Sequence, residues 1–167
     1  MAELTTQERL QPSLLDRLTD DEPLRRDESR EQRVISAARL RECVMRDLSW
    51  LLNSVNLATD QSLEAYSEVR RSVLNFGIPD LAGVAMSGID AAALQQRIRE
   101  AIVAFEPRLI ADTLHVTVQA DARRMDRRSL VFFIESEMWA QPLPLNLYLK
   151  TELDLETGRL DVSEGYA

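Results

Sequence analysis

The hydrophobic pattern between residues 29 and 55 predicts an amphipathic helix. Apolar residues recur at spacings of three and four and fall on one narrow face, namely Ala37, Leu40, Val44, Leu48, Leu51 and Val55. Ser29 is suited to cap the N-terminus, and we expect the helix to end near Leu52 or Asn53. Cys43 and Trp50 lie on a flank of the stripe, where they should pack at its margin.

A second amphipathic helix is predicted between Asp90 and Pro107. Asp90 is a good N-cap residue. The inward-facing positions that follow are Leu94, Ile98, Ala101, Ile102 and Phe105. Pro107 lacks a backbone donor and restricts the residue before it, so the helix must stop there.

From Leu109 onward the period changes to two, which predicts strands. The expected strands cover the alternating run around 114–118, the apolar run 130–139, the run 145–155 and a short last strand at 159–162. The charged segment 121–128 should form a hairpin tip, and Thr157-Gly158 is a turn signal. The order of elements predicts an α+β fold, with two amphipathic helices on one face of an antiparallel sheet of three to four strands.

Residues 1–28 are predicted to form an N-terminal arm, and residues 29–167 the folded domain. Within the arm, Leu10, Leu14, Leu15 and Leu18 recur at helical spacing after Pro12. Two interpretations remain open for this short helix. It folds back onto its own domain, or it lays its leucines in a groove of a partner protein.

Composition and charge narrow the classes of partner. The chain has 167 residues, 45% of them hydrophobic, and a net charge of −8 at pH 7, which argues against general nucleic-acid or anionic-membrane binding. Its one cysteine fits a reducing compartment, and no apolar run approaches the length of a membrane span. We therefore expect a cytoplasmic protein without direct membrane insertion.

The search for catalytic chemistry gives one weak candidate. His115 is the only histidine, and the chain has no nucleophile elbow and no phosphate-binding glycine loop, so no metal or cofactor is expected. Paired carboxylates of the kind that glycoside hydrolysis uses could come from Glu106, Glu135, Glu137, Glu152 and Asp154. A peptidoglycan-cleaving muramidase is therefore the alternative function. However, only 5% of the residues are aromatic, which is few for a sugar-binding cleft.

The junction Glu106-Pro107-Arg108 is unusual on local grounds. The helix macrodipole disfavours an anion at a helix C-terminus by about 0.3–1 kcal/mol, so Glu106 needs a compensating donor. Arg108 is one candidate, and a donor on another protein is the other. Because an exposed ion pair contributes only about 0–1 kcal/mol, we expect Glu106 and Arg108 to serve an interface more than the fold. Their double replacement by alanine should then shift the melting temperature by only a few degrees.

Four segments in register resemble the TssE family of baseplate-wedge proteins from contractile injection machines. They are residues 13–23, 39–53, 72–80 and 105–109, and the likeness extends over most of the chain. Phe76 stands where the family pattern would have tyrosine, which removes one hydroxyl group.

The resemblance implies a non-catalytic structural subunit in the cytoplasmic baseplate of a type VI secretion system. Its partners would be the wedge proteins TssF and TssG, with TssK as a further candidate, and the sheath proteins TssB and TssC. The motif at Glu106, Pro107 and Arg108 would act in assembly, and a nearby strand edge could accept a sheath strand by main-chain pairing. Leu14, Leu15 and Leu18 are the other expected partner-binding residues.

Overall fold

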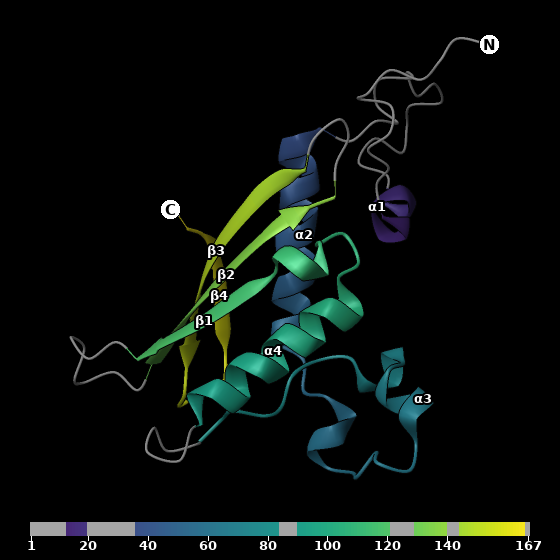
Figure 1. Ribbon diagram of the computed structural model, residues 1–167, viewed down its shortest axis with the longest axis vertical. Coiled ribbons are helices and arrows are strands. Elements are labelled where there is room, and N and C mark those ends of the chain that lie inside the picture. Colours follow the sequence, from purple (N-terminus) through teal and green to yellow (C-terminus); the bar gives the residue numbers. More distant parts are fainter. Residues whose placement is uncertain (1–12, 20–35, 84–89, 121–128, 140–143, 166–167) are drawn as a thin grey trace.

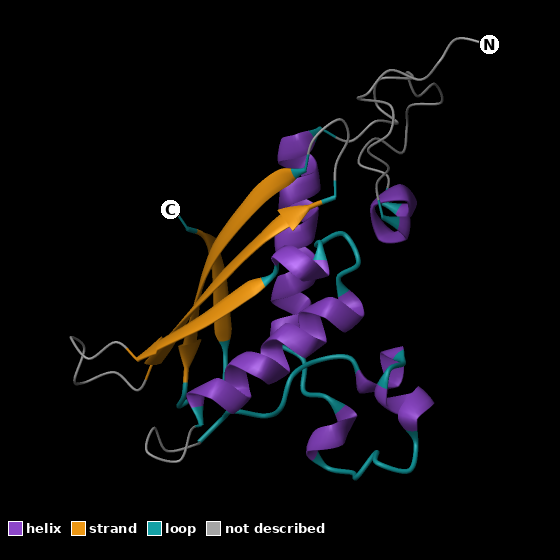
Figure 2. Cartoon of the chain, viewed as in Figure 1, coloured by secondary structure: helices purple, strands orange, loops and turns teal. Residues whose placement is uncertain are grey.

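The fold is α+β, as predicted, with two long helices on one face of an open antiparallel sheet (Figures 1 and 2). The computed structural model describes residues 13–19, 36–83, 90–120, 129–139 and 144–165. The predicted hairpin tip at 121–128 lies outside these residues. Within the described part of the chain, no helix is long and apolar enough to cross a membrane.

The sheet is a meander in which each strand pairs with the next along the chain. Its order is β1-β2-β3-β4, formed by β1 (His115–Ala120), β2 (Ser129–Met138), β3 (Leu145–Asp154) and β4 (Leu160–Glu164). The registers place Val116 opposite Ile134 and Ile134 opposite Leu149. Inward-facing apolar residues therefore line up across three strands, while the alternate positions face away from the helices.

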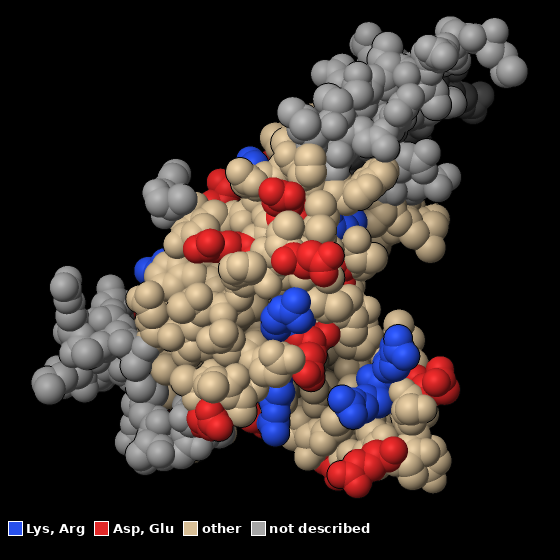
Figure 3. Space-filling model, in the orientation of Figure 1, with Lys and Arg blue, Asp and Glu red and all other residues tan. Residues whose placement is uncertain are grey.

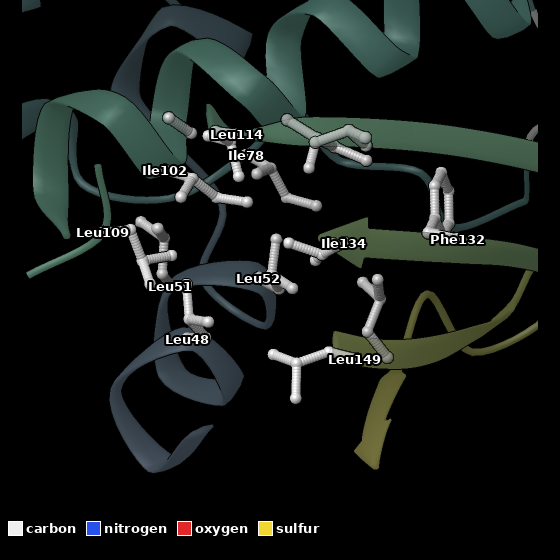
Figure 4. Close-up of a cluster of buried hydrophobic side chains, with 14 of the residues drawn as sticks. Leu48, Leu51, Leu52, Ile78, Ile102, Leu109, Leu114, Phe132, Ile134 and Leu149 are labelled. Carbon is white, nitrogen blue, oxygen red and sulfur yellow. The ribbon is translucent and has the colours of Figure 1, made fainter. Parts of the chain in front are cut away.

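The helix α4 (Ala91–Phe105) lies along β1, and α2 (Ala37–Leu52) contacts both β4 and α4. Asp90 caps α4 as predicted, because its Oδ1 accepts hydrogen bonds from the backbone N–H groups of Ala92 and Ala93 at 3.0 and 3.1 Å. The side chains of Leu48, Leu51 and Leu52 from α2 meet those of the sheet in a dry core (Figure 4).

Helix α2 ends where predicted, with Asn53 as its C-cap, but its start and one residue of its stripe differ from the sequence prediction. The N-cap of α2 is Ser36, whose Oγ accepts from the N–H of Arg39 at 3.1 Å, and not Ser29, which lies outside the described residues. Val55 is 56% exposed because the helix has already ended, so the helical stripe no longer applies there. At the margins of the stripe, Cys43 is buried in the core, whereas Trp50 is 53% exposed.

The first strand begins at His115, as the alternating run around 114–118 predicted, and the residues from Leu109 to Leu114 are not part of it. Leu109 makes only an isolated bridge to Met138 on β2. Between Leu109 and β1 the chain forms the 3-10 turn η5 (Ala111–Thr113), which is stabilised by the hydrogen bonds of Thr113. The hydroxyl of Thr113 donates to the carbonyl of Ile110 at 2.9 Å and accepts the N–H of Glu137 at 2.9 Å.

Residues 54–83, called here the connecting segment, join α2 to the part of the chain before α4. They contain η2 (Leu57–Thr59), α3 (Ser67–Arg70) and η3 (Val73–Asn75), and lie beside α4 in Figure 1. The buried amide of Asn75 holds the segment together, accepting from the N–H of Ala58 at 2.9 Å and donating to the carbonyl of Arg70 at 3.0 Å. The segment folds back on its own start, just after α2, at Ile78, whose N–H and C=O bond to Ser54 and Asn56 at 2.9 and 3.0 Å.

Replacing Gly77 with alanine should strongly destabilise the fold. Gly77 has φ of +121°, and an added Cβ would lie 2.2 Å from the carbonyl oxygen of Ser54. Backbone strain and overpacking together should lower the free energy of unfolding by about 3–5 kcal/mol, measured by urea denaturation. Gly83→Ala is the control, because its φ is also positive, +71°, but an added Cβ meets no atom within 4 Å. Equal losses in the two variants would contradict the close packing of Gly77 against Ser54.

Candidate partner-binding site

The junction after α4 is fixed by hydrogen bonds to the end of β2. Glu106 is the C-cap residue of α4, and its N–H donates to the carbonyl of Ile102 at 2.8 Å. The carbonyl of Arg108 accepts from the N–H of Trp139 at 2.7 Å, and the N–H of Ile110 donates to the carbonyl of Glu137 at 2.9 Å. Pro107 is exposed at the top of this turn. The helix therefore stops where the proline predicted.

The carboxylate of Glu106 is buried and paired with Arg108. Glu106 is only 3% exposed. Its Oε1 accepts from Nε of Arg108 at 2.6 Å and from the N–H of Arg108 at 3.2 Å, while Oε2 accepts from Nη2 of Arg108. This two-pronged arrangement is the strong form of a charge-assisted hydrogen bond. Of the two candidate donors for Glu106, the structure shows the one within the chain.

The pair continues as a line of alternating charges. Nη2 of Arg108 also donates to Asp47 of α2. The other oxygen of Asp47 accepts from Nε of Arg46 at 2.8 Å, and Nη1 of Arg46 reaches Asp16 at 2.7 Å. We call Glu106, Arg108, Asp47, Arg46 and Asp16 the charge chain. It connects the end of α4, the middle of α2 and the short helix α1 (Leu14–Leu18).

Electrostatics favour the ionised form of Arg108 in this setting. Burial alone would lower the pKa of the guanidinium, but the hydrogen bonds and charges of Glu106 and Asp47 outweigh burial and raise the pKa. The arginine is thus held between two carboxylates, one at the end of α4 and one in the middle of α2. One side chain therefore neutralises charge from both α4 and α2.

Helix α1 is held on the domain by Asp16. The Oγ of Ser13 accepts from the N–H of Asp16 at 3.3 Å, and Asp16 accepts from the N–H of Ser13 at 3.2 Å, which forms a capping box. The Asp16 side chain is 8% exposed. Burial raises the pKa of Asp16, but hydrogen bonds from Ser13, Arg46 and Cys43 and the charge of Arg46 lower it to about 2.

The leucines of α1 face outward. Leu14 is 71% exposed, Leu15 41% and Leu18 74%. Of the two interpretations of this helix, the structure shows the first, in which the helix folds back onto its own domain, and the second stays a prediction. The helix does lie on its own domain, but it binds through Asp16 and not through the leucine face. Leu10 lies outside the described residues.

The expectation of an exposed ion pair at the junction is wrong. Glu106 is buried, and its carboxylate is bonded within the chain, because the turn at Pro107 points it toward Asp47 and α2. Nothing in the sequence indicates Arg46, Asp47 and Asp16 as further members of the charge chain. Their partners lie 30 and 61 positions away along the chain, and no local pattern signals such a pairing.

The other candidate carboxylates do not join Glu106. Glu135 and Asp154 are exposed, and Glu137 and Glu152 are half-buried, at positions of β2 and β3 that alternate with the core residues. The helices cover the opposite face of the sheet (Figure 2). His115 is also exposed, and no cluster of three or more possible metal ligands occurs among the residues that the structure describes.

Replacing Arg108 with alanine should destabilise the domain itself. The change leaves the buried Glu106 carboxylate without its partner, and we expect a loss of about 2–5 kcal/mol in the free energy of unfolding. The Glu106→Ala/Arg108→Ala double variant should lose less than the sum of the two single variants, because it leaves no lone buried charge at 106.

Arg159→Ala provides the control for this experiment. Its pair with Asp161 is 3.7 Å long and both side chains are more than three-quarters exposed, so the expected loss is about 0–1 kcal/mol. Urea denaturation compares the four variants, namely the two single variants, the double variant and Arg159→Ala, with the unmodified chain. An Arg108→Ala variant as stable as Arg159→Ala would mean that the junction pair does not support the fold.

Replacing Asp16 with asparagine should release α1 and expose Cys43. The thiol is buried and in contact with Asp16. A pKa lowered from 3.8 to about 2 indicates that the docked state strongly favours the ionised carboxylate. Maleimide labelling of Cys43 at neutral pH should therefore be at least about tenfold faster in Asp16→Asn. Asp161→Asn, at a carboxylate that is 82% exposed, should label as slowly as the unmodified chain.

The depressed pKa of Asp16 also determines how the docking of α1 depends on pH. The folded pKa of Asp16 is depressed, so its contribution is complete above pH 3.8 and is lost as pH falls through about 2. Hydrogen exchange of the amides in residues 13–19 should lose protection in this interval. Protection that persists in Asp16→Asn would show that α1 is held by something else.

Comparison with known proteins assigns the family. The family model described as Baseplate wedge protein gp25 matches residues 38–143, which is more than half of the chain. The match includes α2, the connecting segment, α4, the junction at Glu106 and the first two strands. No curated protein and no solved structure gives a significant match. The chain therefore belongs to the baseplate wedge protein gp25 family, whose members are structural parts of the baseplate of phage-like machines and interact with other baseplate subunits.

Proposed function

We propose that this chain is the TssE-type wedge subunit of a type VI secretion baseplate. In this role it joins TssF and TssG, with TssK as a further candidate, and helps to initiate the TssB–TssC sheath without catalysing a reaction. The observation that carries the proposal is helix α1, which is anchored by a buried charge while its leucines face outward.

Helix α1 has the properties of a docking element. It has only five residues, and so short a helix needs a surface to remain folded. Asp16 supplies that anchor, and the exposed Leu14, Leu15 and Leu18 are left for a partner. Trp50 lies near this helix, since its ring stacks on Arg46 at 5.2 Å, and it is also exposed. An apolar patch of this kind marks a protein interaction site more often than a solvated surface.

The junction would contribute to partner binding through its fixed geometry. Glu106 and Arg108 are held within the chain, and Pro107 is the exposed residue of the motif. The pair fixes the direction in which Pro107 and the start of β1 are presented. We propose that this turn contacts the wedge partners, and that rigidity is what Glu106 and Arg108 contribute to binding.

The sheath contact would use a sheet edge. β1 and β4 are the outer strands, and each pairs with one neighbour among the described strands. β1 is the edge that directly follows the junction. A strand from the sheath could extend the sheet there through main-chain hydrogen bonds.

The muramidase alternative has little support from the geometry. The hollow between α4 and the connecting segment contains Glu64, Asp80 and Glu100, and none of the candidate catalytic carboxylates. Of those candidates, Glu106 is bonded to Arg108, and the others lie on strands β2 and β3. A peptidoglycan digestion assay with the full chain should show no muropeptide release above buffer.

Replacing Leu14, Leu15 and Leu18 with serine should abolish the wedge interaction while leaving the fold intact. The three side chains are exposed, so the melting temperature should change by no more than a few degrees. Because an apolar side chain contributes about 1.5–3 kcal/mol when fully buried, loss of three should weaken binding to a TssF–TssG complex well over tenfold. Co-purification tests whether the variant still binds, and isothermal calorimetry measures its affinity for the TssF–TssG complex.

Val103→Ser is the control, because Val103 is as exposed as Leu15, at 41%, but lies on α4. It should bind like the unmodified chain. Full binding by the leucine variant would rule out α1 as the docking element. Muropeptide release that depends on Glu106 or Glu135 would instead favour the enzymatic alternative.

A further inference from the structure

A hollow of about 940 Å³ lies between the connecting segment and the C-terminal half of α4. We call it the arginine groove. One wall comes from residues around α3 and the other from α4, including Arg97 and Phe105. Figure 3 shows Lys and Arg side chains over both α3 and α4 on the face that contains this region. A hollow of this size is large enough for a peptide segment of a few residues.

The arginines of this groove differ from the others that the structure describes. Six arginines elsewhere each reach an acceptor in the chain, namely Arg39, Arg41, Arg46, Arg99, Arg108 and Arg159. The side chains of Arg70, Arg71 and Arg97 have no hydrogen bond or ion pair with any described residue. All three line the groove. In a chain with a net charge of −8, unpaired guanidinium groups gathered at one place are not explained by the fold.

The carboxylates of the groove do not neutralise these arginines. Glu100 accepts a hydrogen bond from Nε2 of Gln96 at 2.9 Å, and Asp80 accepts the N–H of Ala82 at 2.9 Å. Within the described part of the chain, none of the three lining carboxylates, Glu64, Asp80 and Glu100, lies within ion-pair distance of a groove arginine. Three guanidinium groups, each with five N–H donors, therefore remain available to a ligand.

These donors suit carboxylates and backbone carbonyls. The planar guanidinium fork matches the two oxygens of a carboxylate, and the groove also offers apolar surface at Leu63 and Phe105. Nucleic acid fits less well, since the chain is acidic and Glu64, Asp80 and Glu100 would face its phosphates. The connecting segment also carries exposed apolar area outside the groove lining, because Tyr66, Val73 and Leu74 are 63%, 80% and 67% exposed.

We propose that the arginine groove binds an acidic peptide segment of a partner protein. The carboxylates of that segment pair with Arg70, Arg71 and Arg97, and its apolar residues lie against Leu63 and Phe105. This surface is separate from α1 and from the junction at Glu106. The proposal does not depend on the TssE-type role, and it is tested on the full chain alone.

The test measures binding of a fluorescent peptide in which leucine and glutamate alternate. Fluorescence anisotropy gives the affinity, and amide chemical shifts should change in residues 58–71 and 97–105. The Arg70→Ala/Arg71→Ala/Arg97→Ala variant should bind about tenfold more weakly, since three exposed charge pairs together account for roughly that factor. Affinity should also fall with added salt. Arg159→Ala, at an exposed arginine outside the groove, should bind unchanged.

Two further probes distinguish the occupants. A peptide with lysine in place of every glutamate should not bind, and a single-stranded oligonucleotide should bind more weakly than the acidic peptide. An oligonucleotide that binds more tightly, and is lost in the triple variant, would make nucleic acid the occupant. Absence of acidic-peptide binding, or shifts confined to other residues, would overturn the proposal.

Discussion

The buried carboxylate of Glu106 is the constraint on which the surrounding structure depends. It lies at the C-terminal end of α4, where the helix dipole opposes an anion and burial removes water. Either effect alone would disfavour the charge, and together they require a strong donor. The guanidinium of Arg108 supplies it with two N–H groups and reaches Asp47 with the same arm. Pro107 sets the turn that brings Arg108 back over Glu106.

Once Arg108 is fixed between two helices, the remaining charges follow in order. Asp47 has one oxygen left for Arg46, and Arg46 has one terminal nitrogen directed at Asp16. A five-residue helix that could not persist alone is thus placed by the last member of a line that starts at α4. The charge chain therefore links two surfaces that the sequence presents as unrelated, namely the turn at Pro107 and the leucines of α1. Because neighbouring members of the charge chain polarise one another, removal of one should weaken the hydrogen bonds of the next.

Much of the fold could be predicted because its signals are local. The stop at Pro107 and the cap at Asp90 depend on residues within a few positions of each other, and the periodicity of 145–155 identifies β3 without any partner. The charge chain could not be predicted, since Asp16, Asp47 and Arg108 meet only after both helices have packed. The position of β1 followed from its local alternation, but the 3-10 turn before it could not be predicted for a similar reason. That turn is held by Thr113, whose hydroxyl bonds to Glu137 of another strand.

Burial of the motif changes how mutations there should be interpreted. If Glu106 and Arg108 support the fold, then loss of assembly in their variants does not by itself identify a contact, because a destabilised domain also fails to assemble. The exposed residues carry more information on partners. Leu14, Leu15 and Leu18 on one side, and Arg70, Arg71 and Arg97 on the other, can be changed with little effect on the core. A partner that requires one set and not the other can therefore be assigned to α1 or to the arginine groove, which the buried motif alone cannot achieve.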